Sequence, residues 1–367
     1  MNAPPILRPA DELPRDGQGR LLLKGLTQSE LERWLVEELG ERPFRVTQIW
    51  KWLYIRFVSS FEEMTDLSKG LREKLVELAR VDAIAVDAVF RASDGTRKIT
   101  WKLDSGAIIE SVLIPSENRV TLCISSQVGC AMNCQFCLTA KMGLRGHLST
   151  AEIVDQVAQT RRMFESEGHI SNIVFMGMGE PLANFTNLTR ALQILHGQWG
   201  LNIGARHITV STSGLAPQIK KLADFPLSVR LAISLHGATD EVRSKIMPVN
   251  NKYPLEELFE SLRYFKQRSK HKITFEYILI EGVNDGLDQA RALARRTKSL
   301  EAKVNLIPYN TVEGLPWLRP SEEQQDAFCA TLVANGVPAT IRREKGHDID
   351  AACGQLRLKQ ETAEGLV

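Results

Sequence analysis

From Arg119 onward, short apolar segments typical of strands alternate with amphipathic patterns typical of helices. This alternation predicts a parallel sheet with right-handed crossovers. Six main strand–helix units are fewer than the eight of a closed barrel. We therefore predict an α/β fold built on a partial, open (β/α)6 barrel. The expected strands are 120–125, 173–178, 208–213, 229–235, 273–280, 304–308 and a last short one at 339–343.

The chain before this alternation follows other patterns. The first residues are polar and rich in proline, which indicates a disordered extension. A helical spacing of apolar residues comes next and predicts a small all-α unit. Strand-like alternation around two glycine-containing turns then predicts a small antiparallel segment. The resulting division is 1–20 extension, 21–83 helical accessory domain, 84–115 antiparallel β extension, 116–356 barrel with a C-terminal cysteine loop, and 357–367 tail.

Composition is typical of a globular protein but does not indicate a particular function. Hydrophobic residues make up 43% and charged residues 25%, as in ordinary globular proteins, and the formal net charge is +2. This charge neither requires nor excludes nucleic acid. No signal-peptide pattern opens the chain, and no apolar run approaches the roughly 20 residues of a membrane span. We therefore expect a cytoplasmic protein with no membrane contact.

Three of the six cysteines form a C-x3-C-x2-C loop directly after the first expected barrel strand: Cys130, Cys134 and Cys137. Catalytic groups of β/α barrels gather at this end of the strands. Three thiolates can hold three irons of a [4Fe-4S] cluster and leave the fourth iron open to a small molecule, whereas electron-transfer clusters are closed by four cysteines. A structural zinc site completed by Cys123 is the alternative, although zinc sites usually combine two separated ligand pairs.

Other polar motifs also follow expected barrel strands. Residues 177–181 follow the second strand, where glycines permit a close approach of a ligand and Glu180 can accept hydrogen bonds from an ammonium group. Residues 211–214 and 234–236 follow the third and fourth strands, and Asn310 follows a later one. Singly, these are ordinary turn residues or a structural histidine. Together they line one rim and offer partners for a carboxylate, a ribose and an adenine ring.

The last motif surrounds Cys353 within residues 346–356. A lone cysteine between alanine and glycine can be a small buried apolar residue. We interpret Cys329, within a helical pattern, in that way. Cys353 differs because its small, loop-like surroundings leave room for the thiol to be approached.

These motifs recur in an order that resembles the RlmN family of radical S-adenosylmethionine (SAM) enzymes, over about residues 26–356. The resemblance implies a radical SAM barrel with an N-terminal domain that guides RNA, and a [4Fe-4S] cluster held by the cysteine triplet. The segments that carry it are 123–130, the triplet, 177–182, 211–214, 234–236 and 348–356. The SAM-binding residues that it implies are Gly179, Glu180, Ser211, Ser234, Leu235, His236 and Asn310.

The family methylates C2 of an adenine, at position 2503 of 23S rRNA and position 37 of tRNAs. This carbon is electron-poor, so polar methyl transfer fails and a carbon radical is required. The resemblance implies two SAM molecules per turnover, the first of which converts Cys353 to S-methylcysteine. It further implies that Cys123 resolves the covalent RNA adduct through a disulfide with Cys353, and that Glu110 removes the C2 proton.

The implied partners are 23S rRNA, tRNA and a one-electron reductant such as flavodoxin, and we expect a monomer. Two other functions stay open. The related Cfr group methylates C8 of the same rRNA adenine, but Cfr enzymes tend to have alanine where this chain has Pro181 after Glu180. The alternative from another class is a non-catalytic, zinc-stabilised RNA-binding module.

Overall fold

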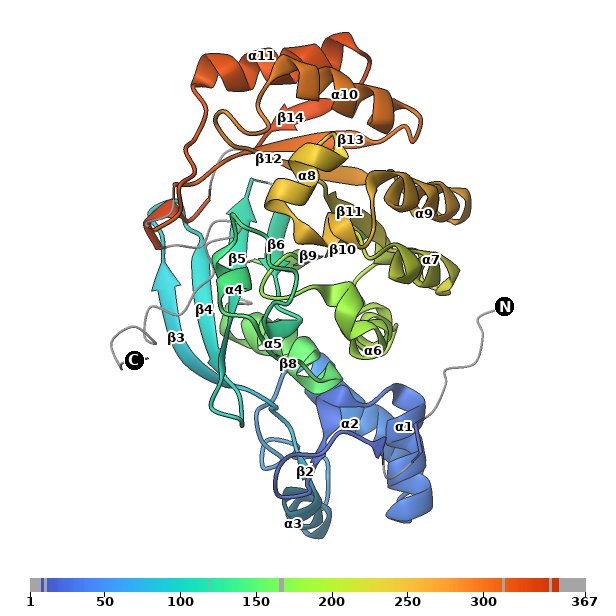
Figure 1. Ribbon diagram of the computed structural model, residues 1–367. Coiled ribbons are helices and arrows are strands. Elements are labelled where there is room, and N and C mark those ends of the chain that lie inside the picture. Colours follow the sequence, from blue (N-terminus) through green and yellow to red (C-terminus); the bar gives the residue numbers. More distant parts are fainter. Residues whose placement is uncertain are drawn as a thin grey trace.

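A computed structural model describes residues 8, 9, 12–117, 119–164, 168–311, 314–342 and 345–349. Figure 1 shows a curved sheet with helices along its outer side, and a small helical unit packed at one end. Among the described residues, no helix combines the length and the apolar character needed to cross a membrane.

Ten strands form one main sheet, in the order β14-β13-β12-β11-β10-β9-β6-β5-β4-β3. Its seven neighbouring strands from β6 to β14 are parallel, and the sheet keeps two ends instead of closing. The prediction of an open, partial barrel is confirmed. The parallel strands are β6 (Arg119–Cys123), β9 (Ile170–Phe175), β10 (Ile208–Thr212), β11 (Arg230–Ser234), β12 (Thr274–Leu279), β13 (Lys303–Pro308) and β14 (Ala339–Ile341).

Helices between these strands cover the outer face of the sheet (Figure 1). The first begins with a capping box, in which the Ser149 N–H donates to Glu152 Oε2 at 2.7 Å and the Glu152 N–H donates to Ser149 Oγ at 3.3 Å. The outer helices are α5 (Thr150–Phe164), α6 (Phe185–His196), α7 (Ala216–Asp224), α9 (Leu255–Arg268), α10 (Leu287–Lys298) and α11 (Glu322–Ala334), with the shorter α8 (Asp240–Ile246) near the barrel mouth.

The antiparallel segment is part of the main sheet and not a separate hairpin. Its strands are β3 (Ala85–Arg91), β4 (Arg97–Lys102) and β5 (Ile108–Ser116), and β5 pairs with β6 in antiparallel register. Val112 of β5 lies opposite Cys123 of β6. The barrel surface therefore continues without a break onto the extension.

The helical unit contains α1 (Gln28–Arg33), α2 (Phe44–Tyr54) and α3 (Lys69–Leu78), with a π-helical turn at Trp34–Glu38. The helices predicted there are confirmed. The buried apolar residues of the unit belong to the same hydrophobic core as those of the barrel, and they include Leu31, Trp34, Ile49, Trp50, Leu53 and Leu75. The short strands β1 (Leu21–Leu22) and β2 (Ala79–Arg80) pair in parallel and close it.

The described part of residues 1–20, for which we expected disorder, makes specific contacts. Leu13 is buried, and Arg8 forms an ion pair with Glu30 at 3.0 Å. Arg190 of α6 also reaches Glu30, at 2.6 Å. Burial opposes ionisation of Glu30, but the hydrogen bonds from Arg8 and Thr27 outweigh it and lower the pKa to about 2. The extension is ordered at Arg8 because the Arg8 cation pairs with the buried Glu30 carboxylate.

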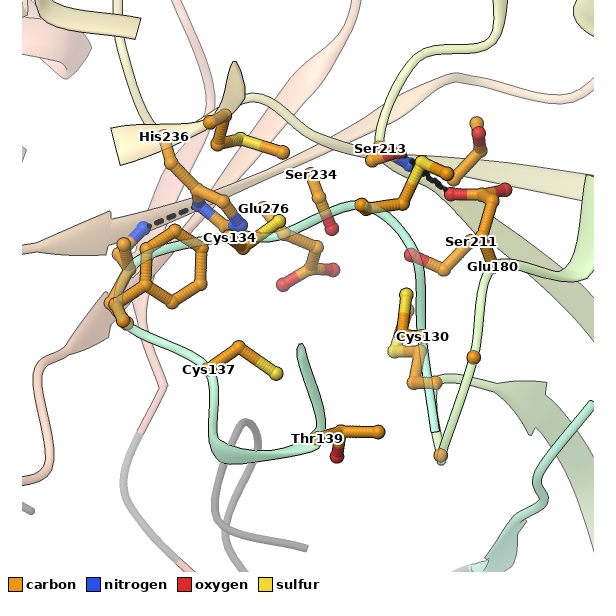
Figure 2. A pocket seen from close by; sticks show the side chains of 18 of the residues that line it. Cys130, Cys134, Cys137, Thr139, Glu180, Ser211, Ser213, Ser234, His236 and Glu276 are labelled. Atoms are coloured by element: carbon orange, nitrogen blue, oxygen red, sulfur yellow. Dashed lines mark hydrogen bonds between the residues drawn. The ribbon is translucent and has the colours of Figure 1, made fainter. Parts of the chain in front are cut away.

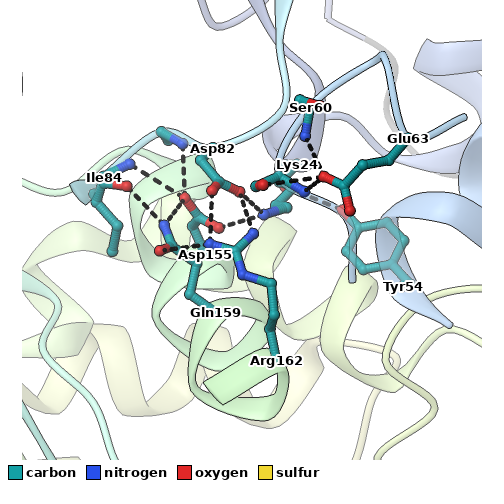
Figure 3. Close-up of polar contacts among 11 residues, drawn as sticks. Lys24, Tyr54, Ser60, Glu63, Asp82, Ile84, Asp155, Gln159 and Arg162 are labelled. Carbon is teal, nitrogen blue, oxygen red and sulfur yellow. Dashed lines mark hydrogen bonds and ion pairs between the residues drawn. The ribbon is translucent and has the colours of Figure 1, made fainter. Parts of the chain in front are cut away.

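A buried ion-pair cluster fastens the helical unit to the barrel (Figure 3). Lys24 is 1% exposed, and its Nζ lies 2.5 Å from Asp155 Oδ1 on α5 and 2.5 Å from Asp82 Oδ1. The second oxygen of Asp155 accepts from the N–H groups of Ala83 and Ile84, at 2.7 and 3.2 Å. The Asp155 carboxylate on α5 thus binds Lys24 at the start of the helical unit and the backbone of Ala83 and Ile84 at its end.

Replacing Lys24 with methionine keeps an unbranched side chain of similar length but removes the cation. Burial raises the pKa of Asp155 and the Lys24 cation opposes that rise, so the variant would leave Asp155 buried beside Asp82 without a cation. Breaking a buried pair in this way costs about 3–5 kcal/mol. We expect Lys24→Met to lower the free energy of unfolding by about that amount, measured by guanidinium denaturation followed by circular dichroism.

The matched control is Lys69→Met, because Lys69 pairs with Glu73 on α3 with both side chains exposed. Exposed ion pairs contribute little to stability, so this variant should unfold close to the wild-type midpoint. Equal losses for the two variants would show that the Lys24 cluster does not fasten the unit.

Candidate functional site

A cavity opens at the C-terminal ends of the parallel strands. It is lined by the loop after β7 (Gln127–Gly129) and by residues of five barrel strands and the loops that follow them. Figure 2 shows the three cysteine side chains directed into this space together with polar side chains from the strands. The predicted residues that line it are Cys130, Cys134, Cys137, Gly179, Glu180, Ser211, Ser234 and His236.

The cysteine loop is supported by a hairpin between β7 and β8 (Leu144–His147). The Cys130 N–H donates to the Gly143 carbonyl at 3.0 Å. Gly129 has a φ of 71°, and a Cβ placed on it would lie 1.8 Å from the Gly143 oxygen. Only glycine fits this position, so the start of the triplet loop is set by the hairpin.

The three thiols fit an iron–sulfur cluster better than a zinc ion. Burial raises the pKa of Cys130 to about 12 and that of Cys134 well above its ordinary value, so both thiolates need a bound cation. Cys123, the fourth ligand of the zinc alternative, lies in β6 and does not line the cavity. Within the described ranges, no three Cys, His, Asp or Glu side chains are arranged to hold one metal ion. Three thiols that share this cavity without Cys123 suit a cluster with one open iron.

Glu180 is engaged by the protein as well as facing the cavity. Its Oε2 accepts from the N–H and the hydroxyl of Ser213, at 2.7 and 2.8 Å, and its Oε1 accepts from the Leu182 N–H at 3.1 Å. Burial raises the pKa of Glu180, and the hydrogen bonds from Ser213 oppose that rise. The Thr212 side chain also lowers the pKa of Glu180 through a hydrogen bond, so protein donors engage most of the roughly four lone-pair sites of this carboxylate. The sequence motif does not reveal the link to Ser213.

The two glycines beside Glu180 pack closely against the chain itself. A Cβ on Gly177 would lie 2.7 Å from the Ile124 carbonyl oxygen, and a Cβ on Gly179 would lie 2.5 Å from Gln127 Cβ. Gly179 also has a φ of 102°. The close approach that we expected for a ligand is therefore made by the loop that leads from β6 to the cysteines, which fixes the distance between these two motifs.

His236 is a neutral histidine that lines the cavity. Its Nδ1 accepts from the Ile278 N–H at 2.9 Å, so the ring hydrogen lies on Nε2. Burial and the neighbouring Arg243 cation lower its pKa to about 3. Asn284 holds the His236 carbonyl through a 2.7 Å hydrogen bond, and the ring packs edge-on against Phe136 of the cysteine loop. Asn284 is a supporting residue that the motif search missed.

Three further predicted residues that the structure describes, Leu235, Asn310 and Glu110, do not line the cavity. Leu235 has a buried side chain and Asn310 is also buried, and neither lines the cavity. Cys353 lies outside the described residues. Glu110 is 1% exposed on β5, with its Oε1 3.7 Å from Lys98 Nζ. Because side chains alternate along strands, Glu110 shares a sheet face with Val112 and hence with Cys123 opposite it.

Two buried polar residues join the elements around Glu110. The Ser125 hydroxyl donates to the Glu110 carbonyl at 2.6 Å and accepts from the Met178 N–H at 2.9 Å. Gln156 of α5 accepts from the Ser125 N–H at 2.9 Å and from the Ser111 hydroxyl at 2.8 Å. The strands of Glu110 and Cys123 and the loop of Glu180 are thereby held as one unit. Sequence analysis missed both connecting residues.

Comparison with known proteins gives consistent matches over nearly the whole chain. Residues 22–81 match the family model "Ribosomal RNA large subunit methyltransferase N-terminal domain", and residues 124–294 match the radical SAM superfamily. A crystal structure of a radical SAM methyltransferase from Sphaerobacter thermophilus superposes with a TM-score of 0.89 at 43% identity, covering 91% of this chain and 98% of that one.

Curated relatives agree with these matches. A probable dual-specificity RNA methyltransferase RlmN from Akkermansia muciniphila is 48% identical over 93% of this chain and 96% of its own length. One from Opitutus terrae, named RlmN 3, is 51% identical over 89% of this chain and 91% of its own length. These matches agree with the three-cysteine loop at the C-terminal ends of the barrel strands. The chain belongs to the RlmN family of RNA methyltransferases within the radical SAM superfamily.

Proposed function

We propose that this protein methylates C2 of an adenine in 23S rRNA, at position 2503, and in tRNAs, at position 37. The observation that supports this most is the shared cavity of three half-buried cysteines, Glu180, Ser211, Ser234 and the neutral His236. Bound there, a [4Fe-4S] cluster and SAM supply the carbon radical that an electron-poor ring carbon requires. We also propose a cytoplasmic monomer that takes single electrons from a reductant such as flavodoxin.

In this proposal, the chain's own residues hold the cofactors and carry the methyl carbon. Cys130, Cys134 and Cys137 bind the cluster. Glu180 accepts hydrogen bonds from the methionyl ammonium group of SAM, and the strand-end residues hold the rest of the molecule. His236 is neutral at every physiological pH, because its pKa is near 3. It therefore offers a fixed Nε2 hydrogen to a ligand and adds no charge beside the sulfonium.

Two cysteines act on the methyl group in turn. The Cys353 thiolate accepts a methyl group from the first SAM, and its sulfur then carries the methylene carbon to adenine C2. The Cys123 thiolate attacks the Cys353 sulfur, and the bond from sulfur to carbon breaks with its electron pair on the methylene carbon. That carbon takes up a proton and becomes the methyl group of the product, and a Cys123–Cys353 disulfide remains. An external reductant restores both thiols. Cys123 is a buried residue of β6, on the same sheet face as Glu110.

Glu110 is the proposed base for the C2 proton. Its side chain is buried on the inner face of the sheet, with its Oε1 3.7 Å from the Lys98 ammonium nitrogen. Its backbone is held by Ser125. The proton acceptor is thus positioned before RNA binds, which a general base requires.

The helical unit is the proposed RNA guide. Its basic side chains Lys51, Arg56, Lys69 and Lys74 are exposed, whereas its aromatic residues Trp50 and Tyr54 are buried in the core. Contacts to phosphate therefore suit this surface better than stacking on bases. The target base itself must leave its stack to reach the barrel cavity.

The product identifies the reaction. Reconstituted protein incubated with SAM, a reductant and unmodified 23S rRNA or tRNA should yield 2-methyladenosine, detected by mass spectrometry of the digested RNA. 8-Methyladenosine as the main product would mean a Cfr-like activity. A colourless protein that neither cleaves SAM nor modifies RNA would mean the zinc-stabilised binding module.

The two cysteine roles predict opposite phenotypes. Cys353→Ala should transfer no label from SAM methyl to RNA and should form no adduct, because the methyl carrier is missing. Cys123→Ala should accumulate protein covalently bound to RNA, visible as a slower band on a denaturing gel. Cys329→Ala, in the half-buried thiol of α11, should behave as wild type. Normal turnover by Cys123→Ala would refute the resolving role.

Glu110→Gln keeps the shape of the side chain but cannot accept the proton. We expect turnover to fall by about two to four orders of magnitude, the range of general-base catalysis, while methylation of Cys353 persists by intact mass. Glu117→Gln, at the exposed end of the same hairpin, is the control. Undiminished turnover of Glu110→Gln would exclude Glu110 as the base.

A further inference from the structure

Glu276 is a buried acid in the cavity with an unused oxygen. It lies on β12, its side chain lines the cavity, and the residue is 5% exposed. Its Oε1 accepts from Asn305 Nδ2 at 3.0 Å, but its Oε2 has no hydrogen-bond partner among the described residues. A buried polar atom without a partner costs free energy, so a ligand that supplies a donor explains its presence.

The strand register places this oxygen beside a residue that we assign to SAM. Ser234 of β11 lies directly opposite Glu276 of β12. Neighbouring strands are roughly 4.8 Å apart, so a hydroxyl and a carboxylate stand side by side on the inner face of the barrel. Figure 2 shows both side chains directed toward the space between the cysteines and Ser211.

The chemistry of the neighbours favours a diol over an ammonium group. An ionised carboxylate only accepts hydrogen bonds, so the ligand must donate. Arg342 lines the same cavity, and its charge acts on Glu276 and partly offsets the rise in pKa that burial causes. A second cation beside Arg342 would be repelled, whereas the two adjacent hydroxyls of a ribose carry no charge. Carboxylates bind ribose hydroxyls in the same way in dinucleotide-binding folds.

We propose that Glu276 is a SAM-binding residue whose carboxylate accepts hydrogen bonds from the ribose hydroxyls of the cofactor, next to Ser234. The proposal rests on the proposed function, because it requires SAM to bind in this cavity. The other SAM-binding residues that we assign come from motifs at the ends of other strands, whereas Glu276 lies within β12, the fifth strand of the barrel.

Equilibrium binding tests this without turnover. Anaerobic calorimetry on the cluster-loaded protein would measure the Kd of S-adenosylhomocysteine, which carries the same ribose as SAM. Glu276→Gln should weaken binding by about tenfold to a hundredfold, as expected for the loss of a hydrogen bond to a charged group. Glu281→Gln, an exposed acid shortly after β12, should leave the Kd unchanged. Wild-type affinity in Glu276→Gln would overturn the proposal.

Analogues that lack one hydroxyl identify the ribose as the contact. The 2′-deoxy and 3′-deoxy forms of S-adenosylhomocysteine should bind the wild-type protein more weakly than the parent compound. Glu276→Gln should show a much smaller penalty, because the acceptor is already lost. Equal penalties in both proteins would mean that Glu276 does not contact the ribose, and would overturn the assignment.

A stability measurement separates binding from a structural role. Glu276→Gln can keep the bond from Asn305 and no longer buries a charge, so the ligand-free variant should unfold at the same temperature as wild type or higher. A clear decrease in melting temperature would mean that the carboxylate serves the fold. Methyl transfer to RNA is assayed separately on wild-type protein, so failure of the proposed function is distinguishable from failure of this inference.

Discussion

The hydrogen bonds between β5 and β6 are the interaction on which the arrangement of this molecule depends. They pair Val112 with Cys123 and end with Ser116 opposite Arg119, joining three antiparallel strands to seven parallel ones. Without this pairing, Glu110 would sit on a detached hairpin at no fixed distance from the cysteine loop. With it, strand alternation places Glu110, Cys123 and the barrel serines on one continuous inner face.

The barrel could be predicted from the sequence because local pattern carries the information. Buried parallel strands are short apolar runs, and the helices between them have one apolar face. Membership of β3, β4 and β5 in the same sheet could not be predicted in this way, because the partner of a strand depends on contacts far along the chain. Order near Arg8 was missed for the same reason: composition shows a polar segment but not the buried Glu30 that it neutralises.

The residues of the candidate site likewise fall into those that the sequence pattern reveals and those that only the fold reveals. Residues in contiguous motifs, such as the cysteine triplet and Glu180, were found from spacing and resemblance. Single polar residues in otherwise apolar segments, such as Gln156 and Glu276, acquire meaning only when strands lie side by side. A lone acid within the apolar strand Thr274–Leu279 was the one available signal for Glu276. The hydrogen bond from Ser213 to Glu180 links two of the motifs, and neither motif alone reveals it.

The hairpin of β7 and β8 gives the cysteine loop a support made entirely of protein. Its start is bonded to Gly143, and further along, the Gln135 N–H donates to the Ile246 carbonyl at 2.9 Å. Both anchors are backbone hydrogen bonds, so they do not depend on the side chains of the loop. Replacing one cysteine of the triplet with alanine therefore removes a metal ligand and leaves both anchors in place.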